Sequence, residues 1–456
     1  MGKISWKIVI TVAVLTVLVV ALPTLMACKS TETTTPAQTA QPAPTAQPQK
    51  VLKVGCISSF SVKEGLELKK WNDLIMKVIN ARGGLKIGND TYKLDFITYD
   101  TTSDTAKARA AQERLIFEDG CKLLTNIWGA DEVQVASICE ENKVLGMGSG
   151  FIDEGAKPNF HYWYRTTGIF FGRGFHYLLF HDYFTRGGTA GLVINPESQS
   201  GHVYAGQIMQ AMQLAGLKTL GEVYYPADTV DFAPIATKVK TMGADVVDLA
   251  GAGGDQAIQI ISNLKDVGWK GFISPSSLNT NQFTNLVQKV GKEYLEGTEQ
   301  LYFDPRGIQK DPTMLQWLNE YTKEYGEFVE TGAFWCSGWW FLQDAMQKTG
   351  STDPEVLRAY LDNSKVGVMV LDGWSQLFAR PDLGNYRTTD VAPGHGIGMI
   401  KDGKLTYFKQ VTVEDQYLAS IKAYGMVDTY QKYWDQYGKP TFPPEQATFT
   451  WDNLTK

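Results

Sequence analysis

Cysteine and histidine are scarce in this chain, which has five of each among 456 residues. So few cysteines exclude a small disulfide-rich scaffold, and the histidines are too scattered to form an obvious metal site. An excess of basic residues is also missing, because the formal net charge is −6, and this disfavours a nucleic-acid-binding protein. Hydrophobic residues make up 43% and aromatic residues 12%, which predicts two or three folded domains rather than a disordered chain.

The sequence also lacks the common enzyme motifs. It contains no H-E-x-x-H, C-x-x-C, Walker phosphate loop or G-x-S-x-G pattern. The glycine-rich stretch 251–254 follows a predicted strand, but the rest of a phosphate-binding fingerprint is missing. We interpret this stretch as a tight strand-to-helix turn that lines a cleft. We therefore expect no enzyme activity, no catalytic or metal-binding residue and no cofactor.

The N-terminus predicts export from the cytoplasm. Two lysines precede the apolar run Ile8–Ala27, which is the pattern of an export signal. The run is also long enough to span a bilayer, so an uncleaved helix anchor is the competing interpretation. Leu25-Met26-Ala27-Cys28 resembles a bacterial lipobox, in which the cysteine carries the lipid. We expect a lipoprotein signal peptide over residues 1–27, with Cys28 lipidated at the outer face of the cell membrane, on the cell surface or in the periplasm.

Residues 28–50 differ in composition from the rest of the chain. They consist mostly of Thr, Pro, Ala and Gln and contain no large hydrophobic residue. Such a segment buries no apolar surface, so we expect a disordered tether. Fully extended, it reaches roughly 65–70 Å. No later stretch approaches 18 uninterrupted apolar residues, so we expect the remainder to be water-soluble.

Strands and helices alternate after the tether. Apolar runs such as Val51–Ile57 and Ala190–Asn195 predict buried strands, and apolar residues at helical spacing over 65–80 predict a helix. The alternation starts again after Arg165, which predicts two α/β units, each with a parallel sheet covered on both faces. The predicted strands are 51–57, 94–100, 122–127, 144–148, 190–195, 219–226, 245–251 and 271–276. One further helix is predicted at 334–349, among otherwise irregular segments after residue 296.

Several segments together resemble the type I periplasmic binding proteins, specifically the branched-chain amino acid/amide group of ABC-transporter substrate-binding proteins, in their lipoprotein form. The likeness covers nearly all of residues 51–410. Its main elements are the opening VLKVGCISSF, Ile79-Asn80-Ala81-Arg82-Gly83-Gly84, the spacing of Asp100 to Ser103-Asp104, Gly201 after a strand, Asp231-Phe232 before a helix, and Gly268.

This resemblance implies an α/β fold of two doubly wound parallel-sheet lobes joined by a three-strand hinge, the periplasmic binding protein-like I fold. The three crossovers would lie near Arg165, Glu296 and Gly373. The expected division assigns residues 51–165 and about 296–373 to lobe 1. It assigns residues 166–295 and about 374–456 to lobe 2.

The resemblance also implies a function without catalysis. The expected protein is an extracytoplasmic solute-binding receptor of an ABC importer, which traps a small molecule between its lobes by hinge closure. Its partners would be the solute, an ABC permease in the membrane and the membrane itself through the lipid anchor. We expect a monomer and no nucleic-acid partner. An alternative is a ligand-sensing receptor that signals through a separate membrane partner rather than feeding a permease.

The expected ligand follows from departures from the family pattern. Amino-acid-binding relatives hold the ligand carboxylate with small hydroxyl residues after the third and fourth strands, but here the first of these loops is Trp128-Gly129-Ala130. The loop that would carry an acid in lobe 2 is Ser274-Pro275-Ser276-Ser277. Because an α-ammonium buried without a counter-charge is costly, we expect an aromatic carboxylate, an amide or another amino acid-like molecule rather than a plain aliphatic amino acid.

The candidate ligand contacts lie in these loops and in the apolar segment FWCSGWWF. Trp128 and Phe151 follow strands, where the cleft is expected, whereas Phe334 and Trp335 suit core packing equally well. Ser149 and Ser276 alternatively cap helices. The full set is Ser59, Phe60, Trp128, Gly129, Ala130, Ser149, Gly150, Phe151, Ser200, Gly253, Ser276, Phe334 and Trp335.

Four cysteines fall within the predicted folded part. Cys121 opens a predicted strand and Cys139 ends the following helix, so the two ends can lie close together. A disulfide there is one option for an exported protein, and two buried free thiols are the other. Cys56 and Cys336 are predicted to be buried and unpaired.

Overall fold

The computed structural model describes residues 50–60, 63–128, 132–150, 153–172, 174–197, 199–226, 228–249, 251–252, 254–275, 278–302, 304–326, 335–362 and 365–442. The chain divides into a unit of residues 1–47 and a unit of residues 48–456, and all described residues belong to the second unit. The predicted signal peptide, Cys28 and all of the tether but its last residue, Lys50, lie outside them. Within the described ranges, no helix is long and apolar enough to cross a membrane.

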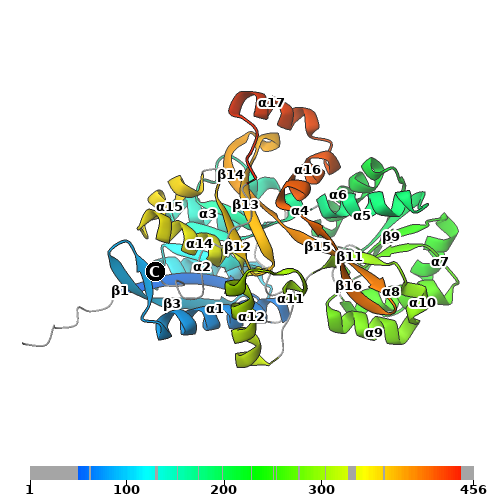
Figure 1. Cartoon of the computed structure of the whole chain (residues 1–456), viewed down its shortest axis with the longest axis horizontal. Helices are drawn as coiled ribbons and strands as arrows, with labels where there is room; N and C mark the ends of the chain where they lie inside the picture. The colour runs from blue at the N-terminus through cyan, green and yellow to red at the C-terminus, as the bar shows by residue number, and fades with distance from the viewer. Residues whose placement is uncertain are drawn as a thin grey trace, which may run out of the picture. The chain divides into compact units, whose positions relative to one another are not determined.

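The first sheet has nine strands in the order β12-β13-β14-β6-β5-β4-β1-β3-β2 (Figure 1). Its central strands are parallel, and antiparallel hairpins extend it at both edges. The strands are β1 (Lys50–Ser58), β2 (Leu85–Ile87), β3 (Asp90–Asp100), β4 (Leu123–Ile127), β5 (Leu145–Gly150), β6 (Trp163–Gly168), β12 (Gly367–Val370), β13 (Gly373–Arg380) and β14 (Asn385–Pro393).

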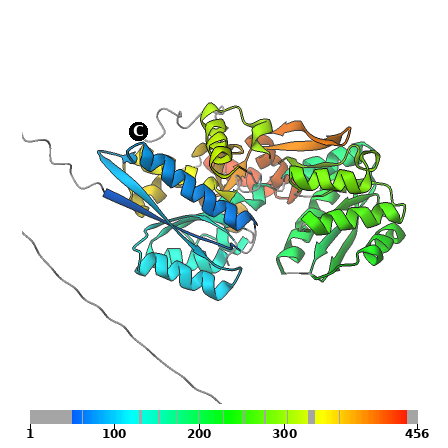
Figure 2. The same cartoon turned by 90° about the horizontal axis from the view of Figure 1, so that it is seen from below.

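Helices cover both faces of this sheet, as Figure 2 shows for α1 on one side and for α2 and α3 on the other. Every residue of β4 and β5 is buried, which is the pattern of a parallel strand covered on both faces. The first face carries α1 (Lys63–Ala81), α12 (Pro312–Tyr325), α14 (Ser337–Thr349) and α15 (Pro354–Leu361). The opposite face carries α2 (Thr105–Phe117) and α3 (Glu132–Asn142).

The second sheet has four parallel strands in the order β10-β9-β7-β8. One of its core clusters includes residues of α5 and α6, and another includes residues of α7, α8 and α9. The strands are β7 (Ala190–Pro196), β8 (Lys218–Tyr225), β9 (Val246–Asp248) and β10 (Phe272–Ser274). The helices are α5 (Gly174–Thr185), α6 (Gln199–Ala215), α7 (Ala233–Met242), α8 (Gly254–Asp266) and α9 (Thr280–Val290).

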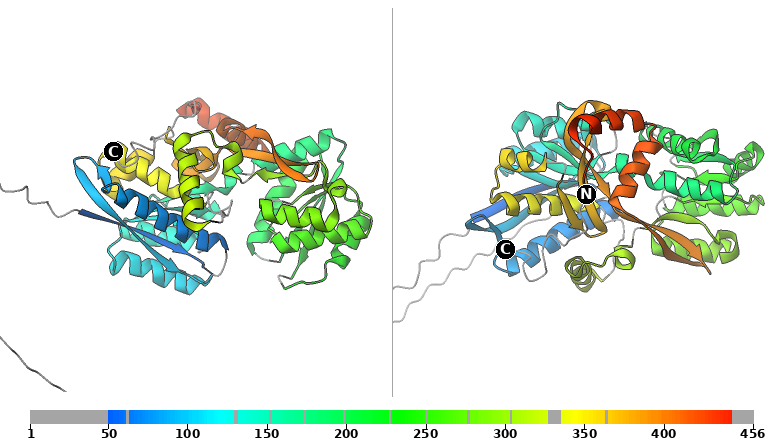
Figure 3. Two further views of the ribbon diagram at one scale, coloured as in Figure 1. Left: turned by 60° about the horizontal axis from the view of Figure 1, so that its bottom comes forward. Right: turned by 45° about the horizontal axis from the view of Figure 1, so that its top comes forward.

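A third sheet joins late parts of the chain in the antiparallel order β11-β15-β16. Figure 3 shows α16 and α17, at the red end of the colour scale, beside the β13–β14 hairpin. The strands of this sheet are β11 (Glu299–Tyr302), β15 (His395–Lys401) and β16 (Lys404–Val411). The other helices of the described residues are α4 (Ile169–Gly172), α10 (Lys292–Leu295), α11 (Pro305–Ile308), α16 (Val413–Ala423) and α17 (Val427–Tyr437). Two short 3-10 helices are η1 (Asp153–Ala156) and η2 (Pro381–Leu383).

The sheet order differs from the expected division in one segment. β13 and β14, over residues 373–393, pair within the nine-stranded sheet beside β6. The chain therefore passes from the first to the third sheet at Gly394, whereas the crossover was expected near Gly373. The physical reason is burial, because nearly all of β13 is buried and its apolar side chains belong to the same core cluster as those of β12.

The four cysteines of the described chain are free and buried. Cys121 and Cys139 form no disulfide in the structure, so free thiols, the second option above, are observed. Burial raises the pKa of the Cys56, Cys121 and Cys139 thiols to about 12. They are therefore protonated and unreactive at neutral pH.

Candidate functional site

The carboxyl ends of β1, β4, β5 and β6 lie at one edge of the nine-stranded sheet, because these strands are parallel. In doubly wound folds, ligands bind beyond this edge. Five predicted ligand contacts lie at the ends of these strands or directly after them: Ser59, Phe60, Trp128, Ser149 and Gly150. The fold therefore groups these five residues along one edge of the sheet.

The loop after β1 is tied to the loop after β3. Ser59 is buried, and its Oγ lies 2.7 Å from Ser103 Oγ. The backbone N–H of Phe60 donates to Asp100 Oδ1 at 2.9 Å, and the same oxygen accepts from the N–H of Thr102 at 2.9 Å. Thr102 and Ser103 both have positive φ angles, a conformation that costs energy outside glycine. The Asp100 carboxylate thus stabilises a strained turn, and the hydroxyl of Ser59 forms a hydrogen bond to Ser103 within this turn.

Trp128 and Trp335 form an aromatic pair at the end of β4. Their ring centroids lie 6.0 Å apart with an interplanar angle of 56°. Both side chains are half-buried and pack against the main core cluster. A half-buried pair of large aromatic rings is suited to bind the apolar face of a small molecule.

Asn126 ties the end of β4, which leads to Trp128, to the start of α14, which follows Trp335. Its side chain is fully buried, and its Oδ1 accepts the backbone N–H of Trp339 at 3.1 Å. Its Nδ2 donates to Asn72 Oδ1 at 2.8 Å, and its carbonyl accepts from the thiol of Cys56 at 3.3 Å. The residue has φ 55°, which asparagine tolerates better than most residues. One side chain thus links the end of β4 to the first turn of α14.

Close packing at the start of α14 depends on Gly338. A Cβ atom at this position would lie 2.6 Å from Thr125 Oγ1 and 3.0 Å from Thr166 Oγ1. The helix therefore approaches the ends of β4 and β6 more closely than any other residue type allows. Sequence reasoning missed Asn126 and Gly338. A polar asparagine inside the apolar strand LLTNI was a signal of a special role, but it does not reveal the partner.

Ser149 and Gly150 are the last two residues of β5, and both are buried. The Ser149 hydroxyl donates to the carbonyl of Ile127 at 3.1 Å and is buried, so it ties two strand ends together. A Cβ on Gly150 would collide with the side chain of Arg165. Glycine at this position therefore leaves the space that the arginine occupies.

Arg165 belongs to a buried ion-pair network behind this edge. Its Nε lies 2.6 Å from Glu132 Oε1, and its Nη1 lies 3.0 Å from Asp390 Oδ2. Asp390 Oδ2 also lies 3.0 Å from Nη1 of Arg380, which pairs with Asp382 at 2.7 Å. Arg165 and Asp390 are also the register pair between β6 and β14. The network therefore joins the late hairpin to the central parallel strands.

The carboxyl edge of the second sheet carries its own polar group. Asp248 at the end of β9 is fully buried, and it pairs in register with Ser274 of β10 and Val193 of β7. Asn195, near the end of β7, is fully buried as well. Asp248 was missed because only the loop 274–277 was aligned with the acid of the relatives. This edge therefore does contain a carboxylate, on the neighbouring strand.

Seven further predicted contacts stay predictions, because the structure describes no side chain for them. Gly129, Ala130, Phe151, Gly253, Ser276 and Phe334 lie outside the described residues, and Ser200 is described only as a backbone position in the first turn of α6. Among the described residues, no group of three or more His, Cys, Asp or Glu side chains is placed to hold a metal ion.

A family model described as a periplasmic binding protein matches residues 70–382, which is more than half of the chain. The chain belongs to the periplasmic binding protein family. No curated protein matches its sequence. The match fits the two parallel sheets covered by helices that are described above.

Solved structures of other periplasmic binding proteins share the fold at low sequence identity. A leucine-binding protein, LivK, from Thermotoga maritima MSB8 has a TM-score of 0.60 and 17% identity, over 79% of this chain and 98% of that chain. An R. palustris solute-binding protein in complex with benzoate has a TM-score of 0.60 and 14% identity, over 79% and 96%. One from Rhodopseudomonas palustris HaA2 in complex with p-hydroxybenzoic acid has a TM-score of 0.61 and 18% identity, over 79% and 97%.

These similarities confirm the predicted fold class and the family resemblance. This periplasmic binding protein has the type I α/β fold with parallel-sheet lobes. Its relatives by structure include proteins of branched-chain amino acid transporters. At these identities the likeness defines the fold, and the ligand has to be argued from this chain's own residues.

Proposed function

We propose that this protein is an extracytoplasmic solute-binding receptor of an ABC importer. It traps an aromatic carboxylate, an amide or another amino acid-like molecule between two lobes by hinge closure. The observation that carries the proposal is the half-buried Trp128–Trp335 pair at the carboxyl edge of the nine-stranded sheet. Large aromatic surfaces at this edge favour a ligand with an apolar face.

The proposed lobes follow the sheets. One consists of residues 51–168 with about 304–393, and the other of residues 174–302 with about 394–411. Helix α16 packs against core clusters of both. This division keeps β13 and β14 with the sheet in which they pair. The role is binding and not catalysis, and the protein acts as a monomer. Lipid on Cys28 holds it at the outer face of the cell membrane, next to its permease.

Because of Asp248, amino acid-like molecules remain among the proposed ligands. A carboxylate at the edge of the second sheet is the kind of group that balances a ligand ammonium. The side chain is fully buried behind the strand ends, however, whereas the tryptophan pair is partly open. We therefore rank aromatic carboxylates and amides ahead of aliphatic amino acids.

A thermal-shift screen of the purified protein tests the ligand class. The compounds are benzoate, 4-hydroxybenzoate, phenylacetate, benzamide and phenylalanine, with leucine, isoleucine and valine as the comparison set. A ligand that binds only the native state adds about 2.7 kcal/mol at 100 times its Kd. We expect at least one aromatic compound to raise the melting temperature. A shift with the aliphatic set alone contradicts the proposed ligand class.

The sensor alternative differs from the importer in what deletion of the gene does. For an importer receptor, a deletion strain takes up less of the radiolabelled ligand, and the gene restores uptake. For a sensor, uptake stays at the parent level, and only the response to the ligand is lost. Normal uptake in the deletion strain contradicts the importer role.

A further inference from the structure

Helix α16 packs against both proposed lobes with different faces. Val413, Tyr417 and Ile421 belong to a core cluster of the first lobe. Ala419 and Ala423 belong to a core cluster of the second lobe, together with residues of α5 and β7. Residues four apart lie on one side of a helix, and the two sets are out of phase, so they occupy different sides. α16 therefore forms a layer between the lobes.

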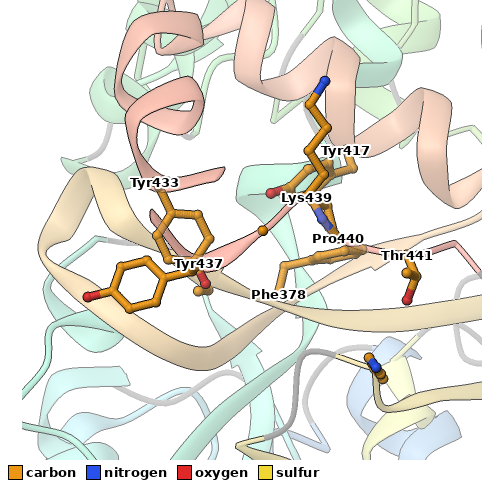
Figure 4. Close-up of a pocket in the computed structure, with 10 residues that line it drawn as sticks. Phe378, Tyr417, Tyr433, Tyr437, Lys439, Pro440 and Thr441 are labelled. Carbon is orange, nitrogen blue, oxygen red and sulfur yellow. The ribbon is translucent and has the colours of Figure 1, made fainter. Parts of the chain in front are cut away.

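The face towards the first lobe carries interlocked aromatic rings. The centroid of the Tyr417 ring lies 4.2 Å from that of Phe378 on β13 and 5.0 Å from that of Phe171 on α4. Figure 4 shows Tyr417 and Phe378 close together, beside the segment that follows α17. Tyr424, directly after the helix, stacks on Phe170 with centroids 4.3 Å apart. Closely packed rings of this kind do not slide past one another without repacking.

Polar contacts strengthen this attachment through α17. The Tyr430 hydroxyl donates to Asp382 Oδ1 at 2.9 Å, and Asp382 also pairs with Arg380 of β13 at 2.7 Å. Gln376 Nε2 of β13 donates to the carbonyl of Thr441, after α17, at 3.0 Å. α16, α17 and the segment that follows are thus fixed to the β13–β14 hairpin of the first lobe.

The face towards the second lobe has smaller side chains. Its two alanines present a smooth surface to α5. A Cβ atom on Gly174, the first residue of α5, would lie 2.4 Å from the carbonyl oxygen of Gln416 and 2.8 Å from Ser420 Oγ. A longer contact is the Lys422 ammonium, 4.8 Å from the centroid of the Tyr177 ring, and a flexible lysine stem can follow a small displacement. Domain closure by shear uses such sliding of packed helices.

Ser420 joins the two sides of the first crossover. Its hydroxyl oxygen accepts the backbone N–H of Gly174 at 2.7 Å, and its proton is shared between the carbonyls of Phe171 and Gln416. Phe171 lies in α4, before the crossover, and Gly174 begins α5, after it. All of these residues are buried. The contact therefore marks the point where the second lobe leaves α16.

We propose that α16 and α17 move as part of the first lobe, and that the second lobe closes by sliding α5 across the alanine face of α16, with the Ser420–Gly174 hydrogen bond at the pivot. The inference rests on the proposed function, because it requires two lobes that close. It adds which surface moves on closure and which stays fixed.

Distances between pairs of spin labels, measured by double electron–electron resonance on the full chain, test this inference. The labels are carried by Ala110→Cys on α2 of the first lobe, Lys238→Cys on α7 of the second lobe and Leu418→Cys on α16, combined in pairs. All three positions are exposed. The wild type, whose four described cysteines are buried, gives the labelling background. The probes are benzoate, 4-hydroxybenzoate, phenylalanine and leucine, each at about 5 mM because small ligands bind weakly.

With a probe that binds, the Ala110–Lys238 and Lys238–Leu418 distances should change by more than about 2 Å, and the Ala110–Leu418 distance by less than about 1 Å. Without any probe, the Lys238–Leu418 distribution should be wider than the Ala110–Leu418 distribution. An Ala110–Leu418 distance that changes on closure, or a ligand-free distribution as wide as that of Lys238–Leu418, overturns the inference. If no probe changes the Ala110–Lys238 distance, closure over a ligand is contradicted, and the ligand-free widths alone support or overturn the inference.

Ser420→Ala tests the pivot, because it removes the hydrogen bond across the crossover. The ligand-free Ala110–Lys238 distribution should become wider than in the unsubstituted pair. Ser262→Ala is the matched control, since Ser262 is also buried and donates to a carbonyl within its own helix, α8, at 2.8 Å. Circular dichroism checks that both variants are folded. Equal widths for the two variants would contradict a pivot at Ser420.

Discussion

The ring centroids of Trp128 and Trp335 lie 6.0 Å apart, although one residue follows β4 and the other precedes α14. The Asn126 side chain makes this possible, because it accepts the backbone N–H of Trp339 and so fixes the helix start against the strand end. The proposed ligand site thus depends on one buried amide as much as on the rings themselves.

Replacing Trp335 should weaken binding of the aromatic ligand found by thermal shift. In Trp335→Ala the ligand loses one aromatic wall, worth roughly 1–1.5 kcal/mol, so Kd should rise about five- to tenfold by titration calorimetry. Trp434→Ala is the matched control, since Trp434 is also half-buried but packs against Tyr417. Equal affinities for the two variants would show that the pair does not contact the ligand.

Asn126→Asp should destabilise the protein with almost no change in volume. The aspartate oxygen that replaces Nδ2 faces Asn72 Oδ1 at 2.8 Å, and a buried charge gains no partner. We expect the free energy of unfolding to fall by roughly 2–3 kcal/mol, measured by urea denaturation. Asn89→Asp, in the exposed turn between β2 and β3, should change it by less than about 0.5 kcal/mol. If both changes lower the free energy of unfolding equally, the hydrogen bonds of the Asn126 side chain do not stabilise the fold.

Asp390 should be among the most sensitive charged positions. Its Oδ2 lies 3.0 Å from both Arg165 and Arg380, and all three side chains are buried. Asp390→Asn leaves two buried guanidinium groups with less compensation, at a cost of about 3–5 kcal/mol. Asp73→Asn breaks only the exposed pair with Lys69 and should cost at most about 0.5 kcal/mol. A small loss at Asp390 would mean that β6 and β14 hold together without the network.

Glu299 should make stability depend on pH. Burial, helped by Asp182, raises the pKa of this carboxyl from 4.5 to about 8, outweighing the ion pair with Arg186. Between pH 4.5 and 8 the native state holds a proton that the unfolded state releases. Raising the pH across this window therefore lowers the free energy of unfolding, by at most about 1.4 kcal/mol per unit.

The Glu299→Gln variant separates this effect from other groups, such as Asp372, whose pKa burial raises to about 7. Its free energy of unfolding should fall less steeply with pH than that of the wild type. Glu293→Gln, at an exposed position on α10, should keep the wild-type slope. If all three proteins show the same slope in denaturation series, Glu299 does not carry a raised pKa.

Sequence periodicity predicted most of the parallel strands, but it missed β6 (WYRTTG) in the centre of the nine-stranded sheet. Long apolar strands such as β4 and amphipathic helices such as α1 are local patterns, so their positions are close to those expected. The strands after residue 366 were missed because their sequences are interrupted by glycine or polar residues. In β15 (HGIGMIK), for example, pairing with β11 and β16 decides the conformation, and local sequence does not reveal that pairing.

The candidate site was only partly predictable for a related reason. The end of a parallel strand is visible in sequence, and this located Trp128 and Ser149. That Trp335 lies against Trp128 depends on a buried amide and on Gly338, which join segments far apart in the chain. Asp248 was missed because the alignment with relatives placed the acid one strand away. Contacts across elements, unlike periodicity, require the folded structure.

Small-angle X-ray scattering with and without ligand tests the central claim most directly. The protein should be measured alone and with a saturating concentration of the compound that gives the largest thermal shift. If two lobes close over the solute, the radius of gyration falls on binding, and Trp335→Ala requires more ligand for the same change. A bound ligand that leaves the radius of gyration unchanged would contradict trapping by hinge closure.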